Sequence, residues 1–438
     1  MNSSIDISKF LLAVSSMSGL VDPILNNHNY RVAFISYSIA REISFSSDFL
    51  YNILVSGLLH DIGLLLVSTQ EDIAFVKAVE LERDKRRMHL HAEIGYELLR
   101  HFPYFSKIAK IIRYHHYSCH EIVRIKAPFS SLILHLADRI DTVIYGRIEK
   151  LGRENPYASI SSIRTLIEEY LLKFSGRVFN PKLVEIFLTK ISPKDSFWFE
   201  LLNENCLKES LEELLRSFSQ KLPFEAFYDL SKMLAYLIDF KSPFTATHSS
   251  GVAQTALSLA TLFNFTSPDL KKIEVAGLLH DIGKIAVPKE ILEKPGRLTP
   301  EEYSIMKSHV FFSYRIISKL AIDTNIVEWA AYHHETLDGS GYPFRLNAND
   351  LSLGSRIMAV ADVFTALMED RPYKKGLSGK ETVAIIEKMV EEGKLDRTVV
   401  NVLKKNLKKV DSHRKKAQER AKELYLSLRN LASDFISS

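Results

Sequence analysis

The sequence has few cysteines and no long apolar run. Only Cys119 and Cys206 occur among 438 residues, and they form no Cys-x-x-Cys pair, so the sequence indicates neither a disulfide framework nor a cysteine zinc site. This usage fits a reducing compartment, and we expect the protein in the cytoplasm. No stretch approaches the roughly 18 apolar residues of a membrane span. The apolar residues 9–14 follow Asp6 rather than a basic cluster, which argues against a signal peptide.

An excess of charge of one sign is also lacking. The 57 Lys and Arg residues nearly balance the 53 Asp and Glu residues, and the formal net charge is +4. The overall charge therefore gives no support to a polymeric nucleic-acid partner. A hydrophobic content of 46% is ordinary for a soluble globular chain. Because 438 residues are too many for one core, we expect two or three domains.

Helical periodicity is what the sequence has in abundance. Apolar residues recur at intervals of three and four, and strand-like alternation is scarce, so we predict an all-α fold. The expected helices include residues 31–41, 49–59, 92–100, 106–115, 131–144, 160–174 and 181–188. A charged C-terminal helix carries an apolar stripe of Ala417, Ala421, Leu424, Leu428, Leu431 and Phe435. We expect it to dock by that stripe with its charges in solvent.

One heptapeptide, Gly-Leu-Leu-His-Asp-Ile-Gly, occurs twice, at 57–63 and at 277–283. The histidines and aspartates around it keep the same order at offsets of 218 to 224 positions. The first series is His28, His60, Asp61, His91, His115, His116 and Asp138, and the second is His248, His280, Asp281, His309, His333, His334 and Asp362. Such agreement over more than a hundred positions predicts a duplicated domain. We expect one domain over 1–221, including a helical connector at about 152–221, and a second over 222–438.

These residue types favour a metal centre in each half. A lone His on a helix is usually a core residue, but five imidazoles with two carboxylates match a transition-metal site for iron, manganese, zinc or nickel. Adjacent His and Asp on a helix project about 100° apart, so the Asp can reach between two ions while the His holds one. The scarcity of cysteine favours a hydrolytic or redox centre over a structural one.

The second half resembles the HD-GYP family, a branch of the HD metal-dependent phosphohydrolases. The motifs are His280-Asp281-Ile282-Gly283-Lys284, Pro288, Ile291-Leu292, Lys294-Pro295-Gly296, Leu298-Thr299, His333-His334-Glu335, Asp338-Gly339, Gly341-Tyr342-Pro343, Ala361-Asp362 and Arg371-Pro372-Tyr373. The first half resembles only the broader HD superfamily, because Leu64 stands at the position of Lys284 and residues 117–121 replace the Gly-Tyr-Pro loop. The expected architecture is thus two tandem HD-type helical bundles.

The resemblance implies hydrolysis of cyclic di-GMP to linear pGpG, GMP or both by a metal-activated hydroxide. It implies two divalent ions, with iron or manganese expected. One ion would be held by His248, His280, Asp281 and Asp362, and Asp281 would bridge to a second ion held by His309, His333 and His334. Asp281 and Lys284 would be catalytic, and the substrate would contact Lys284, Gly341, Tyr342, Arg371 and Lys374.

Some positions depart from the family pattern. Phe244 stands where some members carry a Glu for a third metal, so we expect two ions. Gly251, Ser313 and Thr365 stand where Arg, Gly and Asp are usual, whereas the first half keeps Arg31, Gly95 and Asp141 at the matching places. The missing Asp at 365 matters most, because a nearby carboxylate can orient a metal ligand.

These departures keep other functions open. One alternative is a catalytically weak cyclic di-GMP sensor or partner-binding scaffold, and another is a hydrolase of a different phosphoester such as cyclic GMP-AMP. For the first half, the seven candidate ligands predict a further metal site with a regulatory role. A homodimer or a signalling partner protein is compatible with the sequence.

Overall fold

The computed structural model of the protein describes residues 5–21, 25, 27–67, 85–151, 155–218, 221–241, 247–320, 322–370 and 375–437. In these ranges the regular structure is almost entirely helical, which confirms the predicted all-α class. The exception is a pair of two-residue strands, β1 (Ile5–Asp6) and β2 (Lys221–Leu222), which pair antiparallel with Ile5 opposite Leu222. Among these residues no helix combines the length and apolar character needed to cross a bilayer.

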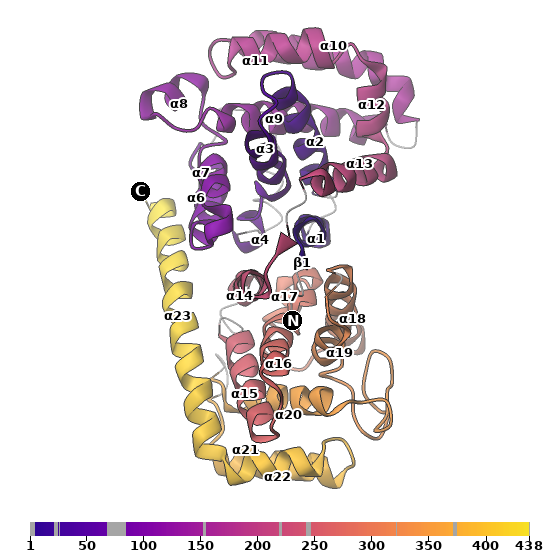
Figure 1. Ribbon diagram of the computed structural model, residues 1–438, viewed down its shortest axis with the longest axis vertical. Helices are drawn as coiled ribbons and strands as arrows, with labels where there is room; N and C mark the ends of the chain where they lie inside the picture. Colours follow the sequence, from indigo (N-terminus) through magenta and orange to yellow (C-terminus); the bar gives the residue numbers. More distant parts are fainter. Residues whose placement is uncertain are drawn as a thin grey trace. The chain divides into compact units, whose positions relative to one another are not determined.

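The chain divides into two compact units, which we call the first and the second unit (Figure 1). The first unit contains residues 7–220, and the second contains residues 221–429 together with strand β1. Each unit is built from helices that pack pairwise around the repeated heptapeptide.

The first unit is a bundle whose central helices are α2, α3, α7 and α9. Its helices are α1 (Ile7–Val21), α2 (His28–Arg41), α3 (Ser47–Leu59), α4 (Leu64–Val67), α6 (Lys85–Arg100), η2 (Pro103–Phe105), α7 (Ser106–Arg113), α8 (Cys119–Ile125) and α9 (Ser130–Leu151), then η3 (Pro156–Ser159), α10 (Ile160–Phe174), α11 (Pro181–Ile186), η4 (Phe187–Ile191), α12 (Asp195–Leu202) and α13 (Glu204–Ser217). The predicted helices at 31–41, 49–59, 106–115 and 160–174 correspond to α2, α3, α7 and α10.

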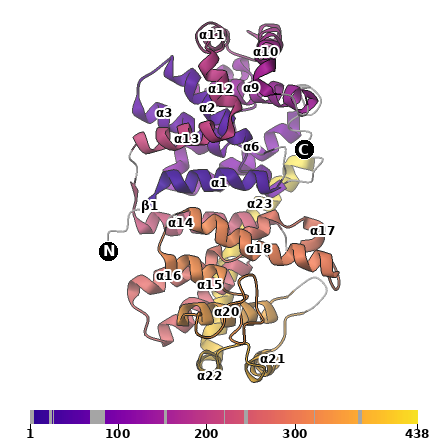
Figure 2. The ribbon, with the colours of Figure 1, turned by 90° about the vertical axis from the view of Figure 1, so that its right-hand side faces the viewer.

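The residues expected to form the closing helices of the first domain and the connector pack onto the first unit. Helix α10 lies on α9, and α13 lies on α1 and α2 (Figure 2). The stripe Leu207, Leu211 and Leu215 explains why α13 packs there, because these side chains share one helix face and all are buried. Residues 155–218 are therefore part of the body of the first unit.

The second unit repeats this plan around α15, α16 and α20 (Figure 1). Its helices are α14 (Phe224–Lys241), α15 (His248–Leu262), α16 (Ser267–Leu279), η5 (Ile282–Ala286), α17 (Lys289–Leu292), α18 (Pro300–Lys319), α19 (Thr324–Ala331), α20 (Leu353–Met368), α21 (Gly379–Glu391), α22 (Arg397–Lys405) and α23 (Leu407–Ser437). Caps fix where the site-bearing helices begin: Thr299 and Glu302 form a capping box on α18, and Ser352 caps α20.

The first glycine of the heptapeptide lets two helices approach closely. A Cβ atom at Gly277 would lie 2.4 Å from the Cα atom of Ala253 on α15, and one at Gly57 would lie 2.4 Å from that of Ala33 on α2. Only glycine tolerates such a contact with backbone. In both units this residue fixes the helix that carries the first histidine against the helix that ends in His-Asp.

The last glycine of the heptapeptide makes a second close approach. A Cβ at Gly283 would lie 1.9 Å from the carbonyl oxygen of His309, and one at Gly63 would lie 2.0 Å from that of His91. In the second unit the Ser313 hydroxyl also accepts a hydrogen bond from the Gly283 N–H at 2.9 Å. The heptapeptide thus clamps three ligand-bearing segments together.

The C-terminal helix α23 docks by an apolar face near its start. Val410 and Ala421 are buried, and Arg414 is buried with an ion pair to Asp411. Ala417 is half-buried. The remaining stripe residues, Leu424, Leu428, Leu431 and Phe435, lie outside the residues whose side chains are described.

Candidate metal centres

Four groups of potential metal ligands occur in the described residues, two in each unit. The second unit has His248, His280 and Asp281 in one group and His309, His333 and His334 in the other, and the first unit has His28, His60 and Asp61, and His91, His115 and His116. Within each group the ligand atoms lie within 4.8 Å of one another. The two groups of each unit lie together at one candidate site. Every residue that the repeat predicts as a ligand, including Asp138 and Asp362, lies at the site of its own unit.

Helix ends and close helix contacts bring the second-unit ligands together. His248 is the first residue of α15, His280 and Asp281 lie between α16 and η5, His309 is in α18, His333 and His334 follow α19, and Asp362 is in α20. Positions at helix ends leave these side chains free of the next helical turn, so they can converge from different directions.

Asp281 lies between the two second-unit groups. Its Oδ2 atom is 3.2 Å from His280 Nε2 and 3.7 Å from His248 Nε2. Its Oδ1 atom is 3.3 Å from His309 Nε2 and 4.0 Å from His333 Nε2. One carboxylate thus presents one oxygen to each group, which is the geometry of a ligand that bridges two ions.

Asp362 also reaches both groups. Its Oδ1 is 3.1 Å from His248 Nε2, and its Oδ2 is 3.8 Å from His334 Nδ1. Neighbouring groups oppose the effect of burial on this carboxyl: burial acts to raise its pKa, but the hydrogen bond from His248 and the charge of His334 hold the pKa well below its usual range. A carboxylate that stays ionised is the form that binds a cation.

Backbone carbonyls orient most of the histidines. The Nδ1 atoms of His280, His309 and His333 donate to the carbonyl oxygens of Gly277, Met306 and Ala330, each three residues earlier, at 2.5 to 2.8 Å. This fixes the tautomer and turns each Nε2 lone pair into the site.

The chemistry of these donors fits a pair of divalent cations. The Nε2 atoms of His280, His309 and His333 are buried and make no hydrogen bond of normal geometry within the described chain, and neither does Asp281 Oδ1. Burial lowers the pKa of His334 to about 4 and that of His333 well below its usual value, so both rings are neutral and can ligate a metal. Buried polar atoms of this kind call for a partner such as a metal ion.

Lys284 is next to the bridging carboxylate. Its ammonium forms an ion pair with Asp281 Oδ2. The short helix η5 that carries it is held by Lys241 on α14, whose Nζ donates to the carbonyls of Ile285 at 2.6 Å and Val287 at 2.7 Å. The cation is therefore fixed beside the candidate metal ligands.

The Gly-Tyr-Pro loop is locked onto the His-His pair. A Cβ at Gly341 would lie 2.5 Å from the Cα of Glu335, so a side chain there would push the loop away. The buried Glu335 carboxylate accepts hydrogen bonds from the N–H groups of Phe344 at 2.7 Å and Leu346 at 3.0 Å. The Tyr342 ring packs on His334 with 4.9 Å between centroids.

This site has an open side. The His334 side chain is 29% exposed, and Tyr303 on α18 is 47% exposed. The Tyr303 ring lies 6.4 Å from the Tyr342 ring, and Lys307 Nζ lies 5.1 Å from the Tyr303 ring centre. An aromatic and cationic rim thus borders the exposed ligand.

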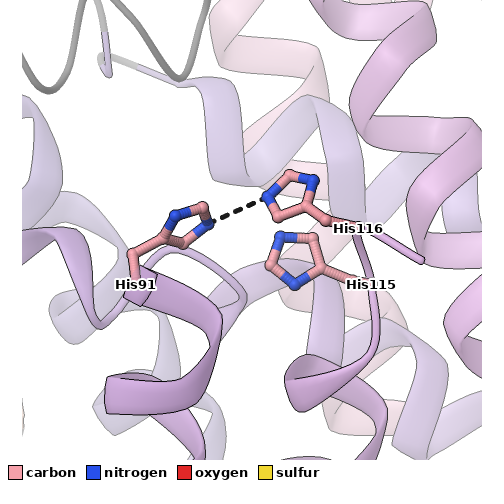
Figure 3. Close-up of side chains that lie close together, drawn as sticks. All are labelled: His91, His115 and His116. Atoms are coloured by element: carbon pink, nitrogen blue, oxygen red, sulfur yellow. Dashed lines mark hydrogen bonds between the residues drawn. The ribbon is translucent and has the colours of Figure 1, made fainter. Parts of the chain in front are cut away.

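In the first unit Asp61 again lies between two histidine groups, but one of its oxygens faces both groups. Asp61 Oδ1 is 3.4 Å from both His60 Nε2 and His91 Nε2, and its Oδ2 is 3.4 Å from His28 Nε2. Figure 3 shows His91 from α6 facing His115 and His116 beyond the end of α7, with His91 and His116 joined at 3.0 Å. A second candidate bridged site is therefore present.

The first-unit site is closed where the second is open. The His116 side chain is only 1% exposed, because His135 packs on it and Phe179 packs on His135. In place of a Gly-Tyr-Pro loop, Ser118 starts helix α8 with a capping box. A buried Arg139 pairs with Asp138 Oδ2 at 2.6 Å.

Two predicted substrate contacts and the position that carries a third-metal Glu in some family members lie outside the described part of the chain. These residues are Arg371, Lys374 and Phe244. In contrast, two residues that the sequence did not single out, Glu369 and Gln418, reach the site. Glu369 contacts His248, and Gln418 contacts Glu369. The only sequence signal was the pair of departures at 251 and 365, which left a ligand without its usual support.

Comparison with known proteins places both units in one domain family. Models of the HD domain match residues 26–143 and residues 232–399. The chain is 33% identical over 390 residues to a 3'3'-cGAMP-specific phosphodiesterase 1 of Vibrio cholerae, covering 87% of both chains. It is 34% identical over 194 residues to a cyclic di-GMP phosphodiesterase of Thermotoga maritima, covering 43% of this chain and 50% of that one.

A solved structure has the same fold. The crystal structure of the cyclic GMP-AMP specific phosphodiesterase V-cGAP3 of V. cholerae aligns with a TM-score of 0.61 at 21% identity, over 93% of this chain and 98% of that one. The 33% identity over 87% of the chain, together with the two HD matches, shows that this protein is an enzyme of the HD-GYP family of cyclic dinucleotide phosphodiesterases.

Proposed function

We propose that the second unit hydrolyses a 3',3'-cyclic dinucleotide with two bound divalent ions, and that 3'3'-cGAMP is the preferred substrate. The observation that carries this proposal is the bridging position of Asp281 between two histidine groups at an open site beside Lys284. We propose iron or manganese as the ions, because imidazole and carboxylate together suit both.

The ions would be held in two groups. His248, His280, Asp281 and Asp362 would hold one, and Asp281, His309, His333 and His334 would hold the other. When bound, they supply a nucleophilic hydroxide near neutral pH and stabilise charge on the phosphodiester. Water then adds at phosphorus, the bond from phosphorus to the 3' oxygen breaks, and the 3' oxygen leaves as a hydroxyl. The product is a linear dinucleotide with a 5' phosphate.

The chain's own cations would neutralise the phosphates. Lys284 lies beside Asp281 and can face either the attacked phosphate or the departing 3' oxygen. Arg371 and Lys374 are proposed to bind the second phosphate, since guanidinium and ammonium groups suit that role. Gly341 is proposed to let the loop lie close to the substrate.

The bases would stack at the open side. Tyr342 and the exposed Tyr303 present aromatic faces next to His334, and purines stack well on such faces. Stacking alone accepts both adenine and guanine. Discrimination therefore needs hydrogen bonds to the base edges, and the choice of substrate has to be measured.

Two substrates compete for the assignment. The relative that matches 87% of the chain is named for 3'3'-cGAMP, whereas the cyclic di-GMP phosphodiesterase of Thermotoga maritima matches 43% of it. We therefore favour 3'3'-cGAMP and keep cyclic di-GMP, which the sequence motifs predict, as the second candidate. Both are second messengers, and we propose a cytoplasmic location.

The test is a comparison of substrates on the purified full chain loaded with Mn²⁺. Initial rates are measured with 3'3'-cGAMP, cyclic di-GMP and cyclic di-AMP, and products are separated to distinguish linear dinucleotide from mononucleotides. We expect kcat/KM to be highest for 3'3'-cGAMP. A higher value for cyclic di-GMP reverses the substrate assignment, and no turnover of any of the three removes the proposal.

For the first unit we propose a regulatory metal site. The candidate ligands lie together, and within the described residues His116 is covered, because His135 packs on it and Phe179 packs on His135. Metal content and turnover of His60→Ala/Asp61→Ala are compared with those of the unmodified chain. The idea is dropped if both are unchanged.

A further inference from the structure

His248 differs from three other second-unit histidines in what orients it. His280, His309 and His333 each donate Nδ1–H to a carbonyl one helical turn earlier. His248 is the first residue of α15, and in the described residues the partner of its Nδ1 is a side chain.

In the first unit that side chain is an aspartate. His28, also the first residue of its helix, donates Nδ1–H to Asp141 Oδ2 at 2.6 Å. Arg31 in turn pairs with the buried Asp141 carboxylate. Burial acts to raise the pKa of Asp141, but the Arg31 charge lowers it to about 2, which keeps the carboxylate ionised.

The second unit has lost both of these groups. Thr365 stands at the position of Asp141 and Gly251 at that of Arg31. The Thr365 hydroxyl contacts Thr255 at 3.3 Å. Without a replacement, His248 would have no carboxylate at its Nδ1 to fix its tautomer.

A different pair of residues occupies the same space. His248 Nδ1 donates to Glu369 Oε2 at 2.9 Å, and the Glu369 side chain is only 9% exposed. Gln418 on α23 donates Nε2–H to Glu369 Oε1, and its own Oε1 accepts from the buried Arg414. Glu369 lies one helical turn farther along than Thr365, and its longer side chain spans the difference.

The missing side chain at 251 is what admits this pair. A Cβ at Gly251 would lie 2.7 Å from Gln418 Nε2 and 2.9 Å from the Thr365 Cγ2 atom. The departures at 251 and 365 and the presence of Gln418 are therefore one coordinated exchange. The HD match of the second unit ends at residue 399, before α23 begins.

We propose that Glu369 and Gln418 are positioning residues for the metal ligand His248, and that α23 is thereby part of the catalytic centre. The inference rests on the metal site of the proposed function. It predicts that loss of Glu369 weakens metal binding at the second unit about 10-fold to 100-fold, as loss of such supporting carboxylates does in other metal sites. Loss of Gln418 should weaken it less, by about tenfold at most.

The experiment measures Mn²⁺ binding and turnover of the full chain. Three variants are tested: Glu369→Ala, Glu369→Gln and Gln418→Ala. The matched control is Glu419→Ala, because Glu419 is the exposed neighbour of Gln418 on α23. Bound Mn²⁺ is measured by titration and after dialysis against a chelator, and circular dichroism checks the fold. We expect weaker Mn²⁺ binding in the order Glu369→Ala, Glu369→Gln, Gln418→Ala, and none of these losses in the control.

A rescue variant separates positioning from general packing. Glu369→Ala/Gln418→Ala is combined with Thr365→Asp and Gly251→Arg, which rebuilds the arrangement of Asp141 and Arg31. Recovery of Mn²⁺ affinity to within a few fold supports the inference. If Glu369→Ala fails to fold, Glu369→Gln and Gln418→Ala decide it.

The outcomes distinguish this inference from the proposed function. Wild-type Mn²⁺ affinity in folded Glu369→Ala and Gln418→Ala overturns the inference while leaving hydrolysis intact. Reduced Mn²⁺ affinity in a protein that turns over no cyclic dinucleotide supports the inference and removes the proposed function.

Discussion

The two units hold the same ligand set in different surroundings. In the second unit Lys284 pairs with the bridging aspartate and His334 is partly exposed. In the first unit Leu64 replaces the lysine and His116 is covered. Helix packing around the heptapeptide therefore builds a cluster of candidate ligands in both units. Access of a substrate to the cluster and a cation beside it determine which chemistry the cluster can perform.

The units also differ in how the first histidine is supported. One uses Asp141 and Arg31, and the other uses Glu369 and Gln418. The requirement is the same because both histidines begin a helix. The supporting carboxylate can come from a different position in the sequence, because only its oxygen has to lie within hydrogen-bond distance of Nδ1.

The largest effect is expected when the bridging carboxylates are compared. Asp281→Asn removes a charge and one of the two oxygens that face the ligand groups, and we expect kcat to fall at least about a thousandfold. Asp61→Asn makes the same change in the closed unit and should leave kcat within about threefold. Initial rates at saturating Mn²⁺ measure both. Equal loss in the two variants would show that the closed unit is required for turnover.

The cation beside the bridge should have the next largest effect. Lys284→Leu gives the second unit the residue of the first and removes a charge that stabilises the transition state, so we expect kcat to fall about a hundredfold with Mn²⁺ binding retained. Lys289→Leu, at an exposed position nearby, is the control. Unchanged kcat in Lys284→Leu would remove the proposed role.

The open rim is expected to affect binding more than chemistry. Tyr303→Ala removes a stacking face worth about 1–3 kcal/mol for a base, so KM should rise roughly tenfold with little change in kcat. Tyr104→Ala, similarly exposed in the first unit, should change neither. Steady-state kinetics with 3'3'-cGAMP test this, and a fall in kcat alone would contradict a stacking role.

The smallest effect concerns stability and pH. Asp239 is buried on α14 and accepts from the Ser249 hydroxyl at 2.7 Å, and burial raises its pKa to about 7. The first unit has Gly19 at the matching position. Between about pH 4 and pH 7 the native state holds a proton that the unfolded chain has lost, so stability falls as pH rises through this window.

From pH 6 to pH 8 the loss should be about 1 kcal/mol, or a few degrees in Tm. Asp239→Asn stays neutral, so its Tm relative to the unmodified chain should rise over the same interval. Thermal melts of the metal-free proteins measure it. A difference in Tm that is constant with pH would show that Asp239 does not titrate there.

Much of the fold could be predicted because it depends on local pattern. The spacing of apolar residues predicted α2, α3, α7 and α10, and the offset of the heptapeptide predicted the second set of ligands. The packing partners of residues 155–218 were harder to predict, because these residues have the periodicity of any amphipathic helix. Periodicity shows that a helix has an apolar face without showing which helix covers it.

The supports of the site were beyond the sequence pattern for a related reason. Glu369 and Gln418 are 49 positions apart, and Gln418 lies on a helix whose charges gave it the character of a solvated surface. Taken by itself, Thr365 at the position of the usual Asp indicated a site with a missing support. Only the contact of α23 with α15 and α20 shows that the lost carboxylate has a substitute.

By itself the sequence determined the helical class, the duplication and the set of candidate metal ligands, because these depend on residue type and spacing along the chain. Tertiary structure decided which site is open, how Asp281 lies between two ligand groups, and which carboxylate orients His248. Those properties depend on distances of a few ångströms between segments far apart in the chain, and packing fixes such distances.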